Sequence, residues 1–267
     1  MLKELANKYR ITEYTSSIDS LIDSKIDAAF VHSATESHKE ITEKLLKHGI
    51  HVYLDKPMAY SYEDSLYLAE LSYKVNKTLM VGFNRRYAPM FRRLKEENTP
   101  EVIIVEKNRT FIPDSPRYFI FDDFVHVVDT LRFLMGKDYM NINVNGLIKD
   151  HKLYNVVLTL SNASTTALGI MNRDSGITEE TVEYMTAGKK LRIENLVLTK
   201  EYVNGKEEHK VFSDWDPTLY RRGFYQIVDE FIESIEQGRK PSISIEDSLK
   251  THAVCEKIVV ELERGLS

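Results

Sequence analysis

The first 83 residues alternate between short apolar runs and longer stretches in which apolar residues recur every three or four positions. The short runs are typical of buried strands, and the longer stretches are typical of amphipathic helices. We predict strands at 26–31, 51–54 and 78–82, and helices at 37–48 and 61–76. Gly49 is expected to end the first helix and Ser61 to cap the second. Strands and helices that alternate in this way predict a parallel sheet covered by helices.

From residue 84 onward, long strands rich in Val, Ile and Thr follow one another with short polar turns, which favours an antiparallel sheet. The predicted strands cover 101–109, 141–149, 153–161, 164–171, 180–186, 189–194 and 197–203, and the predicted helices cover 122–135, 219–236 and 245–264. We therefore predict an α/β protein of two domains, with a parallel sheet in residues 1–83 and an α+β fold in residues 84–267.

The overall composition excludes several kinds of partner. The formal net charge of −5 argues against nucleic acid, because nucleic-acid binding depends on many basic side chains that neutralise phosphates. No apolar run approaches the roughly 20 residues that cross a bilayer, so no membrane association is expected. Cys255 is the only cysteine, which excludes an internal disulfide and favours a reducing compartment. We therefore expect a cytoplasmic protein.

Two short polar segments follow predicted strands of the first domain. Ser33–His38 follows the strand at 26–31, and Asp55-Lys56-Pro57 follows the strand at 51–54. Open α/β sheets bind ligands at the carboxyl ends of their strands, so Ser33, His38, Asp55 and Lys56 are expected to converge on one crevice. The alternative is structural: Asp55-Lys56-Pro57 is then a solvated turn, and His38 is a first-turn helix residue that faces water.

A third polar segment lies in the predicted helix at 122–135. Helical spacing places Asp122 and His126 on one face, and Asp129 follows three residues later. A carboxylate beside an imidazole is a plausible general acid–base pair. Two alternatives remain open: Asp122 or Asp123 starts the helix as its N-cap and His126 is merely part of an amphipathic face, or Asp122, His126 and Asp129 bind a metal. No cysteine pair or His-Glu-x-x-His helix supports a metal, so we expect none.

Taken in order, these segments resemble the Gfo/Idh/MocA family of dehydrogenases over essentially the whole chain. The likeness rests on His38, on Asp55-Lys56-Pro57 in place of Glu-Lys-Pro, on Val81–Tyr87, and on Asp122, His126 and Asp129 in an Asp-x-x-x-His-x-x-Asp helix. The resemblance implies a partial Rossmann-type parallel sheet domain followed by an α+β domain with a large, mostly antiparallel open sheet. It also implies a homo-oligomer that assembles through that sheet.

The resemblance implies hydride transfer between a nicotinamide cofactor, NAD or NADP, and a hydroxyl-bearing carbon of a sugar, polyol or related compound. Lys56 would stabilise the alkoxide, His126 would take or return the hydroxyl proton, and Asp122 would orient His126 or bind a substrate hydroxyl. The residues implied in cofactor binding are Ser33, Ala34, Thr35, His38, Asp55, Lys56 and Asn84. Those implied in substrate binding are Lys56, Asp122, His126 and Tyr225.

One departure from the family pattern bears on cofactor binding. Members of the family open with a strand, a Gly-x-Gly-x-x-Gly turn, a helix and a second strand, together about 60–70 residues. This chain has 11 glycines but no Gly-x-Gly, and residues 2–9 resemble the helix that follows the second strand. We expect a truncated nucleotide domain, explained by a late start site, a shortened polypeptide or natural degeneration. Loss of the two opening strands would expose apolar surface to water, at a free-energy cost of about 25 cal/mol per Å².

Two other functions fit the same residues. A non-catalytic, oligomeric sugar-binding or regulatory module would keep the pocket without the reaction, and a lyase or glycosidase with transient redox chemistry would keep the same side chains. Retention of Lys56, Asp122 and His126 favours an enzyme over a binding module. The sequence alone identifies neither the substrate nor the choice between NAD and NADP.

Overall fold

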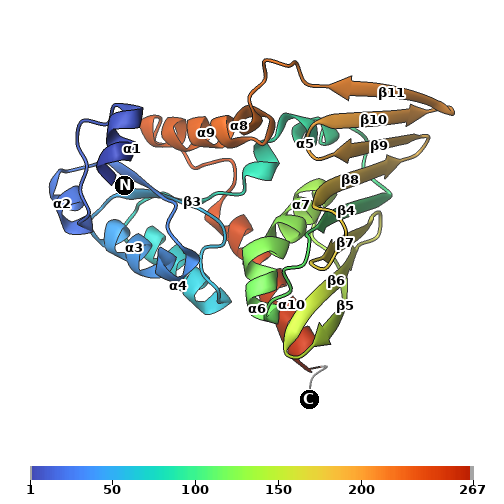
Figure 1. Cartoon of the computed structure of the whole chain (residues 1–267), viewed down its shortest axis with the longest axis horizontal. Coiled ribbons are helices and arrows are strands. Elements are labelled where there is room, and N and C mark those ends of the chain that lie inside the picture. Colours follow the sequence, from blue (N-terminus) through green and yellow to red (C-terminus); the bar gives the residue numbers. More distant parts are fainter. Residues whose placement is uncertain (1, 265–267) are drawn as a thin grey trace.

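A computed structural model describes residues 2–264, which fold around two β-sheets (Figure 1). The first sheet has three parallel strands in the order β1-β2-β3, which confirms the predicted parallel sheet. Its elements are α1 (Leu2–Tyr9), α2 (Ile18–Asp23), β1 (Ala28–Val31), α3 (Thr35–Lys47), β2 (His51–Leu54), α4 (Tyr62–Lys74) and β3 (Leu79–Val81). Helix α2 is an element that the sequence did not predict.

Local signals place the ends of these helices. Gly49 follows α3 with φ at +75°, a conformation that glycine adopts without steric cost. The hydroxyl of Ser61 accepts a hydrogen bond from the Asp64 N–H at 3.1 Å, so Ser61 caps α4 as predicted. Helix α3 begins at Thr35, two residues before the predicted start.

The second sheet has eight strands in the order β11-β10-β9-β8-β4-β7-β6-β5. They are β4 (Val102–Asn108), β5 (Asn141–Lys149), β6 (Lys152–Ser161), β7 (Thr166–Asn172), β8 (Glu179–Thr186), β9 (Lys189–Glu194), β10 (Leu198–Val203) and β11 (Lys206–Val211). The sheet is antiparallel except where β4 and β7 pair in parallel, so the predicted mostly antiparallel sheet is confirmed. Strand β11 was not predicted, because five of its six residues are charged or histidine and no apolar alternation marks it.

Helix α7 (Val125–Met135) covers one face of this sheet. Gly169 on β7 permits the close approach, because a Cβ there would lie 2.8 Å from the side chain of Val127 and 2.9 Å from that of Leu131. On β4, the alternate residues Ile103 and Val105 are buried against the same helix, whereas their neighbours remain half-exposed. The packing fixes α7, and therefore its polar residues, against the ends of β4 and β7.

The remaining helices surround α7 or return to the first sheet. They are η1 (Asn84–Tyr87), α5 (Pro89–Leu94), α6 (Pro116–Tyr118), η2 (Phe119–Phe124), α8 (Thr218–Arg221), α9 (Phe224–Glu236) and α10 (Ile245–Arg264). Two predictions need correction. The helical segment predicted from residue 122 already begins at Pro116 and includes a π-helical turn, η2. The helix predicted at 219–236 is two helices, broken at Gly223.

Helices α9 and α10 tie the two sheets together (Figure 1). Phe231 of α9 packs edge-on against Phe30 and Tyr53 of the parallel sheet, with ring centroids 5.2 and 5.8 Å apart. Helix α10 packs against both α4 and α7 and buries Cys255 completely. Among residues 2–264, no helix is both long and apolar enough to cross a membrane.

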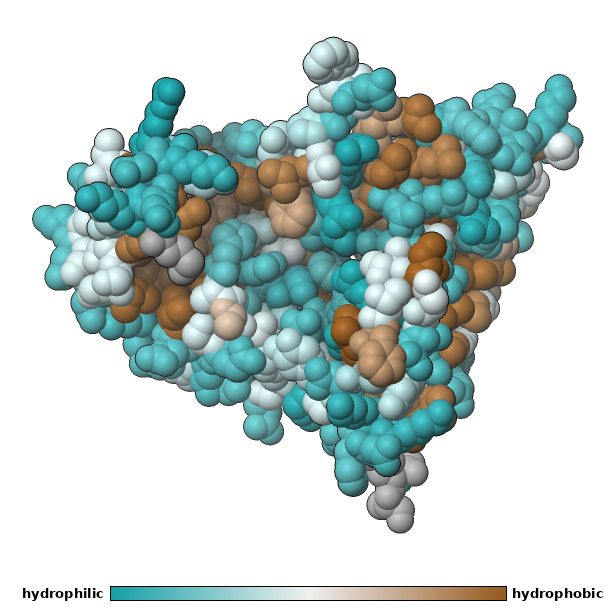
Figure 2. Space-filling model, in the orientation of Figure 1, coloured by the Kyte–Doolittle hydropathy of each residue, from teal (hydrophilic) through white to brown (hydrophobic). Residues whose placement is uncertain are grey.

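Large apolar side chains stay exposed near the first sheet. Leu2, Leu5 and Ile11 are 45–52% exposed, and Phe30 on β1 is 40% exposed. Figure 2 shows hydrophobic side chains gathered around a hollow on the left, beside the region of α1. Apolar side chains of α1, of the loop after it and of β1 are therefore in contact with solvent.

Candidate active site

A cavity of about 560 Å³ opens between the two sheets. Its walls come from the loop after β2, from η1, from the end of β4, from η2 and α7, and from the α8–α9 junction. The lining residues are Asp55, Lys56, Asn84, Arg85, Lys107, Arg109, Thr110, Ile112, Asp122, Asp123, His126, Arg173, Thr178, Arg222 and Phe224. Lys56, Asp122 and His126, predicted from separate parts of the sequence, therefore face one space.

Lys56 lies in the loop that follows β2, at the carboxyl end of the strand. Its ammonium donates a hydrogen bond of 2.6 Å to the backbone carbonyl of Asp122. The carboxylate of Asp55 accepts the N–H of Lys56 at 2.8 Å, and the Lys56–Pro57 peptide bond is cis. The ammonium makes no ion pair among residues 2–264, so two of its three donors remain available to a ligand.

His38 connects the loop that carries Lys56 to the loop after β1. Its side chain is 1% exposed, with one ring nitrogen 2.8 Å from the carbonyl of Pro57 and the other 3.0 Å from the carbonyl of Ser33. The alternative in which His38 faces water is therefore wrong, and its ring does not line the cavity. The imidazole joins the loops after β1 and β2, which keeps Lys56 in place.

His252 of α10 fixes the other end of the same loop. Its Nε2 accepts the N–H of Met58 at 2.9 Å, and its Nδ1 lies 2.8 Å from the carbonyl of Ser248. Burial lowers the pKa of His252 to about 4, so the neutral ring can accept one hydrogen bond and donate the other. No sequence signal pointed to His252, because its role depends on a backbone group 194 residues away.

Asp122 and His126 straddle the junction of η2 and α7. The π-helical turn makes the alternative in which Asp122 caps a helix wrong, since the helical segment starts at Pro116. Single π turns often occur at functional sites. Within residues 2–264, the imidazole of His126 has no hydrogen-bond partner in the protein. Loss of hydration and the nearby charges of Lys107 and Lys56 hold the pKa of His126 well below its ordinary value.

Asp129 does not share this cavity. Its carboxylate is buried between α7, η1 and α10, where it pairs with Arg86 at 2.6 Å and accepts a hydrogen bond from the hydroxyl of Thr251 at 2.9 Å. Asp122, His126 and Asp129 therefore do not converge on a metal. Among residues 2–264, no group of three or more His, Cys, Asp or Glu side chains is arranged to bind one.

The other residues named from the family pattern lie at different depths. Ser33 and Ala34 are exposed, and Thr35 begins α3 and hydrogen-bonds Tyr60. None of the three lines the cavity described above. Tyr225 is 47% exposed and does not line it either, whereas its neighbour Phe224 does.

Asn84 is buried and joins η1 to the α8–α9 junction. Its side-chain amide donates to the carbonyl of Arg222 at 2.8 Å. Gly223 makes this contact possible, because its φ is +82° and a Cβ there would lie 2.3 Å from the carbonyl oxygen of Asn84. Asn84 therefore both lines the cavity and holds Arg222 and Phe224 at its rim.

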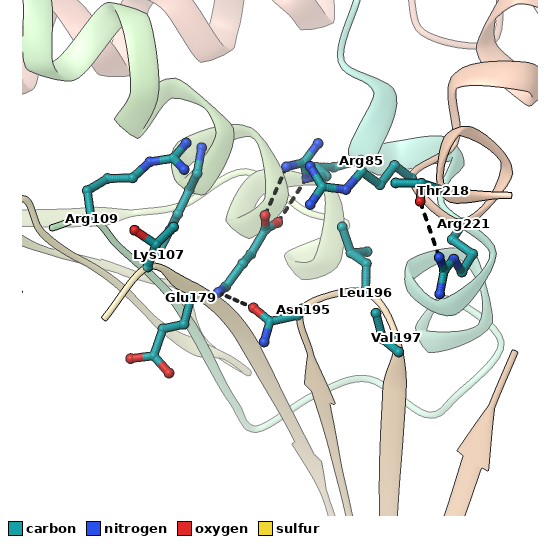
Figure 3. Close-up of a pocket in the computed structure, with 12 residues that line it drawn as sticks. Arg85, Lys107, Arg109, Glu179, Asn195, Leu196, Val197, Thr218 and Arg221 are labelled. Carbon is teal, nitrogen blue, oxygen red and sulfur yellow. Dashed lines mark hydrogen bonds and ion pairs between the residues drawn. The ribbon is translucent and has the colours of Figure 1, made fainter. Parts of the chain in front are cut away.

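Sequence reasoning missed the basic lining of the cavity. Lys107 and Arg109 extend the inward-facing row of β4 (Figure 3). They share the carboxylate of Asp123, with the Arg109 contact at 2.9 Å. Arg85 pairs with Glu180 through two hydrogen bonds of 2.9 Å. The available signal was the strand alternation, because charges at positions 107 and 109 continue a row that is otherwise apolar.

Burial and pairing set the charges of this lining. Burial lowers the pKa of Lys107 to about 8, although Asp123 opposes the shift. Burial alone would raise the pKa of Asp123, but Arg109 and Lys107 hold it well below its usual range. At neutral pH, Asp123 is therefore ionised and most of the Lys107 population is charged. The result is a basic cavity that is also lined by one neutral imidazole, that of His126.

Comparison with known proteins identifies the family of the chain. A family model described as "Oxidoreductase family, NAD-binding Rossmann fold" matches residues 2–83, and one described as "YceM-like, C-terminal domain" matches residues 89–203. The two matches define an oxidoreductase with an NAD-binding Rossmann domain followed by a second domain. The chain belongs to the Gfo/Idh/MocA oxidoreductase family.

Individual relatives cover nearly the whole chain. YceM of Salmonella typhimurium is 32% identical over 90% of this chain and 80% of its own length. The crystal structure of the dehydrogenase MviM from Clostridium difficile is 34% identical, covers 97% of this chain and 86% of that one, and superposes with a TM-score of 0.92. A Gfo/Idh/MocA family oxidoreductase from Vibrio cholerae is 26% identical, with 99% and 87% covered and a TM-score of 0.93. Both the resemblance and the fold class predicted from sequence are thereby confirmed.

Proposed function

We propose that this chain transfers a hydride between a nicotinamide cofactor and a hydroxyl-bearing carbon of a sugar, polyol or related compound. The observation that carries the proposal is the position of Lys56, whose ammonium is held by the Asp122 carbonyl in the same cavity as a neutral His126. Myo-inositol 2-dehydrogenase of Thermotoga maritima, 24% identical over 92% of this chain and 80% of its own length, supports a polyhydroxylated substrate.

The side chains divide the proton chemistry between them. As the substrate hydroxyl loses its proton, neutral His126 accepts it and becomes an imidazolium. The ammonium of Lys56 donates a hydrogen bond to the same oxygen and stabilises its developing negative charge. The carbon–hydrogen electron pair leaves as a hydride and a carbonyl forms. In the reverse direction, His126 returns the proton to the reduced oxygen.

The nicotinamide end of the cofactor fits the residues present at this edge of the parallel sheet. Asp55 lines the cavity, and one oxygen of its carboxylate accepts a hydrogen bond from the Lys56 N–H. The other oxygen can accept a hydrogen bond from a ribose hydroxyl. Asn84 lies on the same wall, and Ser33, Ala34 and Thr35 open helix α3 nearby in the fold. When bound, the oxidised cofactor supplies the acceptor for the hydride.

The experiment follows reduced nicotinamide formation with NAD or NADP at millimolar concentration and a panel of sugars and polyols. Turnover of at least one compound that is lost in Lys56→Met supports the proposal. If sugars bind to the protein by calorimetry but none is oxidised, the non-catalytic binding module is the better description.

We also propose that a polypeptide of these 267 residues binds NAD(H) weakly, because it contains no Gly-x-Gly turn to receive the pyrophosphate. Titration calorimetry tests this directly. Weak or undetectable heat is expected, and micromolar binding would overturn the proposal. The choice between NAD and NADP follows from comparing the two in the same titration.

A homo-oligomer formed through the open sheet is part of the proposal. The face of the sheet that points away from α7 carries the half-exposed apolar residues Val102, Ile104, Leu168 and Ile170 in neighbouring strands. A second copy would cover this patch and remove it from water. Light scattering coupled to gel filtration is expected to give a dimer or larger, and Ile104→Lys is expected to shift it toward monomer. A wild-type protein that is monomeric in this measurement would overturn the proposed homo-oligomer.

A further inference from the structure

We propose that the substrate carries an acidic group, a phosphate or a carboxylate, and that Arg173 binds it. The inference rests on the proposed function, because it names the class of compound that the same cavity takes. It starts from the charge of the lining, where six basic side chains face three acidic ones. Neutral sugars do not require such an excess.

The excess persists after every observed ion pair is taken into account. Lys107 and Arg109 share one carboxylate, that of Asp123, although they bring two positive charges to it. Arg85 is neutralised by Glu180. Positive charge therefore remains around Asp123 inside a partly enclosed space, where an anion would be held more strongly than in bulk water.

Arg173 is the most informative of these side chains. It follows β7, is only 5% exposed, and lines the cavity. Two of its nitrogens, Nε and Nη1, are buried and have no hydrogen-bond partner in the protein, and no carboxylate among residues 2–264 pairs with the guanidinium. The guanidinium carbon lies 5.1 Å from the centroid of the Phe119 ring, a cation–π contact.

An unpaired buried charge is costly, so such groups are normally paired with an opposite charge. The backbone holds Arg173 in position all the same, because its N–H donates to Tyr154 at 2.8 Å and its carbonyl accepts from Ile112 at 2.7 Å. A planar guanidinium is suited to bidentate recognition of a phosphate or carboxylate. A ligand with such a group would supply the partner that the protein lacks.

The elements that carry the basic residues indicate that the acidic group belongs to the substrate and not to the cofactor. Arg173 and Arg109 follow strands of the second sheet, and Arg222 lies at the α8–α9 junction, exposed at the rim. None of the three comes from the parallel sheet, which carries the proposed nicotinamide contacts. A second basic cavity of about 320 Å³ adjoins the first and shares Arg85, Lys107, Arg109, Thr178 and Arg222 with it, which leaves room for an anionic extension of a sugar (Figure 3).

The test compares ligands that differ in charge, using calorimetry on the full chain without cofactor. The probes are inorganic phosphate, D-glucose 6-phosphate, D-glucuronate and D-glucose. At least one of the three anions is expected to bind ten times or more tightly than glucose, and added salt is expected to weaken it. Phosphate and glucose 6-phosphate distinguish a phosphate site from the carboxylate site that glucuronate would reveal.

Variants then assign the effect to Arg173. Arg173→Gln is expected to lose about tenfold or more in affinity for the preferred anion, since a charge-assisted hydrogen bond contributes about 1.5–3 kcal/mol. Arg173→Lys is expected to retain part of it, and the exposed Arg10→Gln serves as the matched control. The melting temperature of unliganded Arg173→Gln should not fall, because no paired charge is lost, whereas a purely structural arginine would lower it.

Each outcome separates the inference from the function on which it rests. Equal binding of glucose and the anions, no binding of any anion, or equal losses in the Arg173 and Arg10 variants would each overturn the acidic-substrate inference and leave hydride transfer in place. Binding of an anion through Arg173 without oxidation of any anionic or neutral sugar would instead support the anion site and count against the proposed reaction.

Discussion

The charged residues on the two sides of the helical segment 119–135 differ in whether they have partners of opposite charge. On the side away from the cavity, Asp129 and Asp247 face Arg86 and Arg132, and each arginine has a carboxylate partner. On the cavity side, basic residues outnumber acidic ones and His126 has no hydrogen-bond partner among residues 2–264. Both sides are largely buried, so burial alone does not explain the contrast.

The contrast separates charges that stabilise the fold from charges that await a ligand. A satisfied buried network links η1, α7 and α10 and is costly to break, because removing one partner leaves the other unpaired. An unsatisfied lining costs stability in the free protein and becomes favourable only when a ligand supplies the missing partners. The same segment therefore anchors η1 and α10 on one side and lines the proposed active site on the other.

The largest expected effect tests the satisfied side. Asp129→Asn should lower the free energy of unfolding by about 3–5 kcal/mol, because it removes a carboxylate that pairs with buried Arg86. Urea denaturation measures the loss. The control is Asp138→Asn, which breaks the exposed pair with Lys250 and is expected to be close to neutral. Similar losses in both variants would mean that the network around Arg86 is no more important than a surface pair.

The next prediction tests the cavity side. Lys56→Met should reduce kcat/KM by about 10²–10³-fold, because the donor that stabilises the alkoxide is lost. The unfolding midpoint should change little, since the lysine makes one hydrogen bond and no ion pair among residues 2–264. Lys39→Met on the exposed face of α3 is the matched control and should retain activity. Activity that survives in Lys56→Met would remove the lysine from the mechanism.

Much of the fold could be predicted because its signals are local. Strand β5 and helix α10 lie where the apolar period placed them, and the parallel sheet follows from strands that alternate with helices. The stretch 84–94 was not predicted as helical. It begins with polar residues whose burial depends on distant partners, such as the Arg222 carbonyl for Asn84 and Glu180 for Arg85.

The candidate site also has features that could be predicted from the sequence and features that could not. Strand ends, helical spacing and family resemblance were enough to bring Lys56, Asp122 and His126 to one cavity. The π-helical turn and the unpartnered state of Arg173 were not predictable, because both depend on which groups meet across the packed core. Asp129 shows the limit of a motif, since it shares the family pattern with His126 but does not line the cavity and instead pairs with Arg86.

A pH titration extends the comparison to the loop that carries Lys56. The pKa of His252 is depressed to about 4 in the folded state, so its stabilising contribution is present above the unfolded pKa near 6.5 and is lost as pH falls toward 4. Between pH 7 and pH 5 the wild type should lose about 2 kcal/mol from this group. His252→Gln should show a correspondingly smaller pH dependence in urea denaturation. If the free energy of unfolding depends on pH equally in the wild type and in His252→Gln, His252 is not the group responsible for the loss.

The smallest expected effect connects the basic lining to catalysis. Desolvation and the charge of Lys107 both lower the pKa of His126, so its neutral form should persist as pH falls below about 6.5. The rate of substrate oxidation requires that neutral form, and its acid limb should therefore lie below this value. Lys107→Met removes a positive neighbour, so the pKa of His126 should rise and the acid limb should move to higher pH. Exposed Lys152→Met is the control, and an acid limb that stays in place in Lys107→Met would show that the basic lining does not control the protonation of His126.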